Sequence, residues 1–136
     1  MSKEAFAFVK ANLASAPFHD WLKPELVEIT EAGVKLRLAL RPDFGRMRER
    51  VEVHGGVMAA LIDIAGYAAA ASKAMRTCAT IDLRVDYLRS AGGTALEATA
   101  TFVKLGRIIT VVDVTVADDS SKAVAAGRGA YLMSNG

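Results

Sequence analysis

The stretch that decides the fold is residues 53–75, VHGGVMAALIDIAGYAAAASKAM. Between residues 57 and 72 it is apolar or small, and Asp63 is its single charged side chain. A helix that is apolar on nearly all sides either crosses a membrane or is wrapped by its own protein. The stretch is short for a span and is interrupted by Asp63 and Lys73. We therefore predict a buried central helix over about residues 55–75, kept thin by its alanines so that a sheet can close around it.

Two features of this helix carry chemistry. Gly55 and Gly56 stand at its N-terminus, where unpaired N–H groups and the helix dipole favour negative charge, such as a developing thioester or ester oxyanion. Asp63 lies among apolar neighbours, and a buried ionised carboxylate is costly without partners. His54 and Asp63 are nine positions apart, which is about 13 Å along a helix. If both ends act on one substrate, the site lies between two subunits whose helices run antiparallel.

Composition limits the classes of function. The chain has 136 residues, which suits one domain over 1–136, and 52% of them are hydrophobic. A net charge of +2 does not indicate nucleic acid binding, although clustered cations suit an anionic ligand. The single Cys78 excludes an intrachain disulfide, and His19 and His54 give no metal-ligand spacing. The N-terminal sequence lacks a signal-peptide pattern, so we expect a cytoplasmic protein with no membrane partner.

The other segments give a coarse fold. Residues 3–14 predict a short amphipathic helix that stops before Pro17, and residues 18–22 read as an aromatic connector. Residues 27–40 predict two strands joined by a turn. Four further strands, predicted to form one antiparallel meander with alternating faces, follow the central helix at residues 80–87, 95–104, 108–117 and 123–133. The order predicts an α+β fold, in which one curved antiparallel sheet wraps around one long helix.

Three polar features each have two interpretations. His19 is a catalytic histidine or an ordinary residue of the connector. Residues 46–52, RMRERVE, form a solvated loop or an entrance loop whose arginines meet an anion. Asp63 is catalytic or is a structural carboxylate that pairs with Arg84.

Four segments resemble the hotdog-fold acyl-CoA thioesterases of the phenylacetate-degradation (PaaI-like) type: HGGVMAALIDIAGYAAA, TIDLRVDYLRSA, VKLGRIITVVDVTV and AAGRGAYL. The resemblance runs over about residues 18–133, and its most specific part is HGG with an aspartate nine residues after the histidine. It implies a hotdog fold and a dimer with a continuous sheet, which assembles as a dimer-of-dimers homotetramer. It also implies hydrolysis of acyl-CoA thioesters at subunit interfaces, without a metal or redox cofactor.

The resemblance assigns catalytic roles to four residues. Asp63 matches the catalytic carboxylate, which acts as general base or as nucleophile. Gly55 matches the residue whose backbone N–H polarises the thioester carbonyl, and His54 matches the histidine beside it. Thr80 matches a serine or threonine that helps to hold the attacking water.

The resemblance also implies where the substrate binds. Many relatives carry an asparagine six residues before the histidine, and this chain has Arg48 there. The segments that match the CoA-binding positions are Tyr87, Leu88, Arg89 and Ser90, and Lys104, Leu105, Gly106 and Arg107. The cations among them suit the nucleotide phosphates. An acyl pocket for aryl or medium-chain groups is expected from Phe18, Trp21, Met58, Leu61 and Ile62.

Three functions are therefore compared. The first is acyl-CoA thioester hydrolysis through Asp63. The second is a hydratase or dehydratase acting on acyl-CoA or acyl carrier protein, which the spacing between HGG and Asp63 disfavours. The third is a non-catalytic acyl-CoA binder or sensor, which the arginine at position 48 leaves open.

Overall fold

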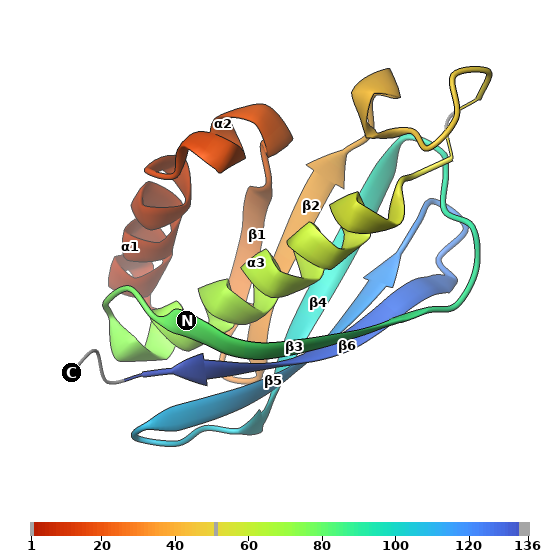
Figure 1. Cartoon of the computed structure of the whole chain (residues 1–136). Helices are drawn as coiled ribbons and strands as arrows, with labels where there is room; N and C mark the ends of the chain where they lie inside the picture. The colour runs from red at the N-terminus through yellow and green to blue at the C-terminus, as the bar shows by residue number, and fades with distance from the viewer. Residues whose placement is uncertain (1, 51, 134–136) are drawn as a thin grey trace.

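The computed structural model describes residues 2–50 and 52–133, so the predicted domain limits 1–136 include positions 1, 51 and 134–136 outside the described residues. One sheet curves around the long helix α3, and α1 and α2 lie to one side of that helix (Figure 1). The elements in chain order are α1 Lys3–Ala14, α2 Pro17–Leu22, β1 Glu25–Thr30, β2 Gly33–Ala39, the 3-10 helix η1 Pro42–Phe44, α3 Gly55–Ala74, β3 Ala79–Tyr87, β4 Ala95–Lys104, β5 Ile109–Ala117 and β6 Ala123–Leu132.

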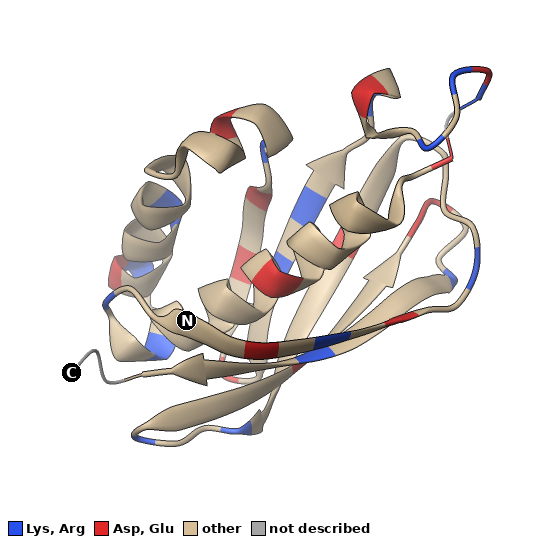
Figure 2. Ribbon diagram, in the orientation of Figure 1, with Lys and Arg blue, Asp and Glu red and all other residues tan. Residues whose placement is uncertain are grey.

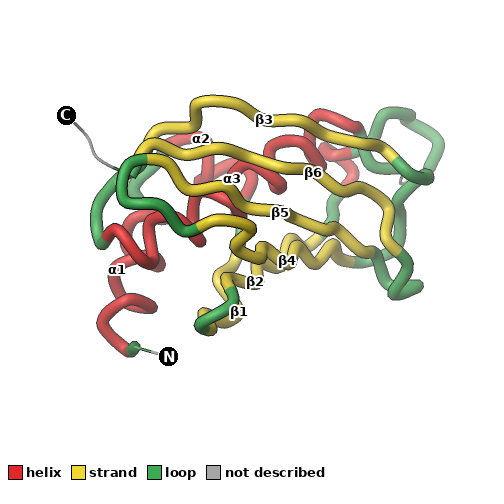
Figure 3. Tube along the Cα trace, turned by 90° about the horizontal axis from the view of Figure 1, so that it is seen from below, coloured by secondary structure: helices red, strands yellow, loops and turns green. Residues whose placement is uncertain are grey.

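The described strands form one antiparallel sheet in the order β1-β2-β4-β5-β6-β3, and Figure 3 shows them side by side. This confirms the predicted α+β class with a curved antiparallel sheet around one long helix. The predicted meander of four strands is wrong, because β3 pairs with β6 and only β4, β5 and β6 follow one another as neighbours. The turn residues at 90–93 allow the chain to reverse direction after β3, but they do not determine which strand pairs with β3.

The long helix α3 is the core of the fold. It begins at His54, whose side chain caps the helix, and ends at Met75 in the left-handed conformation with φ 53°. Its alanines are small enough for the sheet to approach closely, and Ala65 and Ala68 are fully buried. Figure 2 shows that α3 carries few charged residues. By length and hydropathy α3 could cross a membrane, but 67% of its most apolar window is buried by the rest of the protein, as in a core helix.

The inner face of the sheet supplies the other half of the core. Alternate residues of β2, β4 and β5 are buried, as expected for strands with one solvent-facing side. The largest of these buried strand side chains are Leu36, Leu38, Leu96, Val112, Val114 and Val116. They pack around α3 and hold it against the sheet.

Strand β3 departs from the predicted alternation. Thr80 pairs with Tyr131 and Asp82 pairs with Ala130, so Ile81 is an additional residue on β3. This β-bulge turns the Ile81 side chain outward, where it is 53% exposed, and brings Thr80 to the face that meets α3. The strict alternation predicted for residues 80–87 is therefore wrong at the start of the strand.

The predicted connector at residues 18–22 belongs to a short helix. Pro17 is the first residue of α2, where the missing N–H of proline costs nothing. The Nδ1 atom of His19 lies 2.8 Å from the carbonyl oxygen of Leu13, to which it can only donate. His19 thus ties α2 back to α1.

Candidate active site

Asp63 is half-buried in the middle of α3 and meets two hydroxyl groups from the β3–β6 edge of the sheet. Thr80 donates to Asp63 Oδ1 at 2.8 Å. The hydroxyl oxygen of Tyr131 lies 3.1 Å from the carbonyl oxygen of Asp63 and 3.4 Å from its Oδ1. The alternative in which Asp63 pairs with Arg84 is wrong, because that guanidinium contacts Asp86 at 3.2 Å.

Tyr131 was missed by sequence reasoning. It is fully buried on β6, and burial together with the Asp63 carboxylate raises the pKa of the Tyr131 hydroxyl far above its ordinary value. Two glycines make room for it, since a Cβ on Gly66 or Gly129 would lie 2.1 or 2.3 Å from its hydroxyl oxygen. Tyr131 lies in AAGRGAYL, one of the segments that carry the resemblance, and the two glycines point to it only once the packing of α3 on β6 is known.

The start of α3 presents a backbone amide. His54 Nδ1 accepts the N–H of Gly56 at 2.8 Å, so the exposed imidazole caps the helix. The N–H of Gly55 is the first in the helix and has no acceptor within it. Tyr87, at the end of β3, donates to the carbonyl oxygen of Gly55 at 3.0 Å. A Cβ on Gly55 would lie 3.2 Å from the Tyr87 ring, so glycine lets the aromatic ring pack on the helix start.

The carboxylate and the helix start do not meet in one protomer. Gly55 and Asp63 are eight residues apart on one helix, which corresponds to about 12 Å. Their polar partners are also separate, since Tyr87 contacts the helix start while Thr80 contacts Asp63. Within this chain, the carboxylate and the helix start therefore do not form one compact site.

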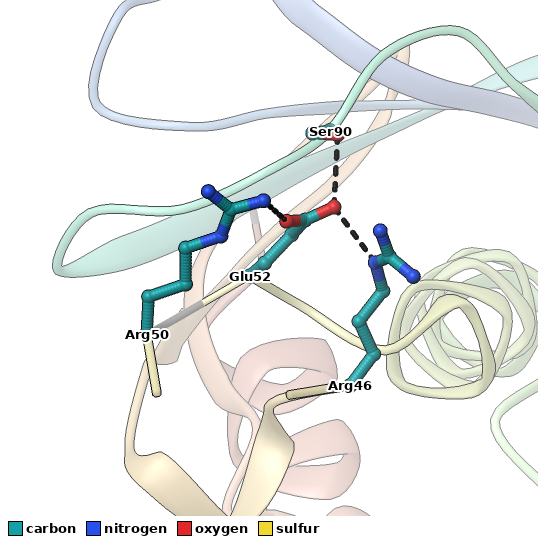
Figure 4. Close-up of polar contacts among 4 residues, drawn as sticks. All are labelled: Arg46, Arg50, Glu52 and Ser90. Atoms are coloured by element: carbon teal, nitrogen blue, oxygen red, sulfur yellow. Dashed lines mark hydrogen bonds and ion pairs between the residues drawn. The ribbon is translucent and has the colours of Figure 1, made fainter. Parts of the chain in front are cut away.

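Glu52 organises the charged loop before α3, and sequence reasoning missed this role. Its side chain is 11% exposed and accepts from Arg46 Nε at 2.7 Å and from Arg50 Nη2 at 3.0 Å (Figure 4). Ser90 completes the cluster by donating to Glu52 Oε1 at 3.1 Å. These hydrogen bonds, that of Arg46 above all, hold the pKa of the Glu52 carboxyl below its ordinary value. The cluster thus ties residues 46–50 to the segment that follows β3.

Arg48 differs from the other two arginines of this loop. Arg46 and Arg50 are engaged by Glu52, whereas the exposed Arg48 has no ion pair with the residues described here. The loop surrounds a cavity of about 590 Å³ lined by residues 42–43 and 45–50. Arg46, Arg48 and Arg50 are the arginines of the predicted entrance loop. Glu52 pairs with Arg46 and Arg50 but not with Arg48.

The two segments expected to bind CoA lie at opposite ends of α3. The Tyr87 end of β3 contacts Gly55, at the start of the helix. The hairpin between β4 and β5 lies near the helix end, where Arg107 and Lys73 line one cavity of about 430 Å³. Figure 1 shows this hairpin and the end of β3 far apart. One protomer does not bring the segments together.

Each of these segments is held in a defined conformation. Arg89 donates through Nε to the carbonyl oxygen of Ala123 at 3.1 Å, and Leu88 is 54% exposed. In the hairpin, the N–H of Gly106 donates to Thr110 Oγ1 at 3.1 Å, and that hydroxyl donates back to the carbonyl oxygen of Gly106 at 3.2 Å. The neighbouring side chains at the tip are exposed, namely Lys104, Leu105 and Arg107.

The residues expected to line an acyl pocket fall into two groups. Met58, Leu61 and Ile62 are buried in the core, whereas Phe18 and Trp21 are 52% and 45% exposed. Trp21 packs edge-on against Phe44 with the ring centres 5.1 Å apart. The isolated protomer does not place the two groups around one open pocket.

The side chains offer no obvious metal site. Across residues 2–50 and 52–133, no group of three or more His, Cys, Asp or Glu side chains lies close enough to hold a metal ion. The chemistry available at Asp63 is that of a carboxylate beside two hydroxyl groups.

The curved antiparallel sheet wrapped around the long apolar helix α3 is the hotdog fold, which a solved structure of a thioesterase-superfamily protein shares. The family follows from comparison with known proteins. Residues 52–125 match the thioesterase superfamily, and this chain belongs to that family.

Relatives and solved structures agree with the family. A candidate esterase of Halobacterium salinarum is 40% identical over 60% of this chain, and the match spans 60% of that protein. The medium/long-chain acyl-CoA thioesterase YigI of Salmonella typhimurium is 27% identical over 86% of this chain and 85% of its own.

Two solved structures show the same fold. A crystal structure of another thioesterase-superfamily protein has a TM-score of 0.88 at 31% identity, covering 94% of this chain and 97% of its own. The Escherichia coli PaaI protein of the phenylacetic acid degradation operon has a TM-score of 0.87 at 22% identity, covering 99% of this chain and 96% of its own.

Proposed function

We propose that this chain hydrolyses acyl-CoA thioesters to a free acid and CoA. The observation that carries the proposal is the Asp63 carboxylate, which lies in an apolar stretch of α3. Its Oδ1 atom accepts a hydrogen bond from the Thr80 hydroxyl at 2.8 Å. Membership of the thioesterase superfamily and the similarity to YigI, named as a medium/long-chain acyl-CoA thioesterase, support the same reaction.

The reaction can run in two ways from this carboxylate. As general base, Asp63 takes a proton from water while the water oxygen bonds to the thioester carbonyl carbon. The carbonyl electron pair moves onto its oxygen, the C–S bond then breaks, and the CoA thiolate leaves and is protonated. As nucleophile, an Asp63 oxygen bonds to the carbonyl carbon, CoA leaves, and water hydrolyses the resulting anhydride.

The oxyanion needs a donor that one protomer does not supply beside Asp63. We propose that it is the N–H of Gly55 in a second copy, whose α3 lies antiparallel to the first. β3 is one of the two edge strands of the described sheet, with β1 at the other edge. Ile81 on β3 and Leu88 just after it are exposed. A second copy that pairs along β3 would extend the sheet and cover these side chains. We expect a homodimer, or a tetramer built from two such dimers.

The same arrangement proposes how CoA binds. In an antiparallel pair, the hairpin at the end of α3 in one copy approaches the start of α3 in the other. Lys104 and Arg107 would then join Arg89 around the phosphates of a single CoA, and Arg48 adds a fourth cation near the helix start. Because Arg48 stands where many PaaI-like enzymes carry asparagine, a non-catalytic acyl-CoA binder is the alternative that an experiment must separate.

The test is thiol release from phenylacetyl-, benzoyl-, hexanoyl- and palmitoyl-CoA. Asp63→Asn keeps an oxygen acceptor for Thr80 and removes the base, so we expect a loss of at least about 100-fold. Asp82→Asn is the matched control, because Asp82 is an exposed carboxylate two residues from Thr80 on the same strand. Binding of acyl-CoA without thiol release by the wild type would instead establish the binder. Equal rates in wild type and Asp63→Asn would refute the assignment of Asp63.

A further inference from the structure

We propose that Tyr131 is a positioning residue for Asp63, whose hydroxyl bridges the carbonyl oxygen and Oδ1 of Asp63 and leaves Oδ2 as the reactive oxygen. This inference rests on the proposed function, because it assigns a role to Tyr131 in hydrolysis through Asp63. It adds a residue from β6 to a site otherwise built from α3 and β3.

The first step in the argument is the placement of the hydroxyl. Tyr131 has no exposed surface, and its hydroxyl oxygen lies 3.1 Å from the Asp63 carbonyl oxygen and 3.4 Å from Asp63 Oδ1. A buried tyrosine hydroxyl needs a partner, since an unpaired one is costly. Both acceptors belong to the same residue and share the single hydroxyl hydrogen, with the backbone carbonyl oxygen the closer of the two. The hydroxyl therefore links the backbone of Asp63 to its side chain.

The second step is the space made for the ring. A Cβ on Gly66 would lie 2.1 Å from the Tyr131 hydroxyl oxygen, and a Cβ on Gly129 would lie 2.3 Å from it. Gly66 is on the helix, one turn beyond Asp63, and Gly129 is on the same strand as Tyr131. The absence of side chains at both positions creates a slot that leads from β6 to Asp63.

The third step is that the two carboxylate oxygens of Asp63 differ in their hydrogen bonds. Thr80 and Tyr131 are paired across β3 and β6, and both hydroxyl groups approach Oδ1 of Asp63. Within the described parts of the chain, no hydrogen bond to Oδ2 is found. Thr80 at 2.8 Å and, more weakly, Tyr131 at 3.4 Å orient the carboxylate through Oδ1. Oδ2 is therefore the oxygen left for water or for the thioester carbonyl carbon.

The experiment compares Tyr131→Phe with Tyr67→Phe. Tyr67 lies one turn beyond Asp63 on α3, and its hydroxyl donates to Asn12 on α1, so the control removes a similar hydroxyl without touching Asp63. We expect Tyr131→Phe to lower kcat about tenfold with KM within about twofold, because a hydrogen bond toward a charged group is lost. Tyr67→Phe should change neither quantity.

A second measurement does not depend on activity. Tyr131→Phe should lower Tm by about 3 °C or more in the wild type and by less in an Asp63→Ala background, whereas the loss from Tyr67→Phe should be the same in both. Equal losses for Tyr131→Phe in both backgrounds, or kinetics like those of Tyr67→Phe, would overturn the proposal. If the wild type hydrolyses no thioester, the proposed function fails, and the Tm comparison still decides whether Tyr131 holds Asp63.

Discussion

Combining two inactive variants in one dimer tests whether the active site is shared between subunits. Asp63→Asn removes the carboxylate but leaves an amide oxygen that can accept from Thr80. Gly55→Pro removes the amide hydrogen at the helix start and adds a pyrrolidine ring there. Proline is tolerated at the first position of a helix, and His54 before it already has the extended conformation that proline requires, with ψ 135°. The ring of Tyr87 must shift slightly, which its 54% exposure permits.

The expected magnitudes follow from the roles of the two groups. Loss of the base should lower kcat by about 10²- to 10⁴-fold, and loss of one oxyanion donor by about 10²- to 10³-fold. In a heterodimer of the two variants, one site carries both defects, while the other combines Asp63 of one subunit with Gly55 of the other. We therefore expect about half of the wild-type activity per dimer, as for a two-fold symmetric pair with one intact site.

The assay is thiol release by heterodimers isolated through two different affinity tags after co-expression. A heterodimer of Asp63→Asn with Asp82→Asn is the control, because it should keep about half of the activity wherever the oxyanion donor comes from. Activity of the Asp63→Asn and Gly55→Pro heterodimer no higher than that of the two parents, with an active control, would refute the shared site. The base and its donor would then have to meet within one protomer.

Three further predictions concern other parts of the structure. Gly66→Ala forces a Cβ against the Tyr131 hydroxyl and should lower the free energy of unfolding by about 1–3 kcal/mol, measured by urea denaturation. The pKa of the Glu52 carboxyl is lowered, so its ion pairs stabilise the loop at residues 46–50 above the ordinary Glu pKa and weaken as the pH falls. The protection factors of the loop amides, which correct for the intrinsic pH dependence of exchange, should therefore fall in acid and should be lower in Glu52→Gln than in the wild type at pH 7. Arg107→Ala should raise KM for acyl-CoA with little change in kcat, while the exposed Lys122→Ala leaves both unchanged.

The sequence predicted those features that depend on local pattern. The central helix follows from an apolar run with a capping histidine, and the strands follow from alternation. The isolation of Asp63 among apolar residues marks it as a candidate catalytic residue, and that role stays a prediction. The resemblance marked Thr80 as a residue that helps to hold the attacking water, and the structure shows that Thr80 donates to Asp63.

The features that were missed depend on contacts between distant segments. The position of β3 beside β6 is decided by sheet pairing, which turn residues at 90–93 do not encode. Tyr131 reads as an ordinary core residue until the helix that packs over it is known. Glu52 reads as one more charge in a charged loop until Arg46, Arg50 and Ser90 surround it.

The extra residue in β3 also decides the directions of two side chains of this strand, Thr80 and Tyr87. Thr80 and Tyr87 are separated by seven positions, an odd number, and residues an odd number apart in a regular strand point to opposite faces. Both nevertheless reach α3, one at Asp63 and the other at Gly55. The extra residue Ile81 reverses the alternation of side chains between them, so that both residues point to the face of β3 that contacts α3. A deletion of Ile81 would keep the strand, but Thr80 and Tyr87 would then point to opposite faces. Only one of the two contacts with α3, at Asp63 or at Gly55, could form at a time.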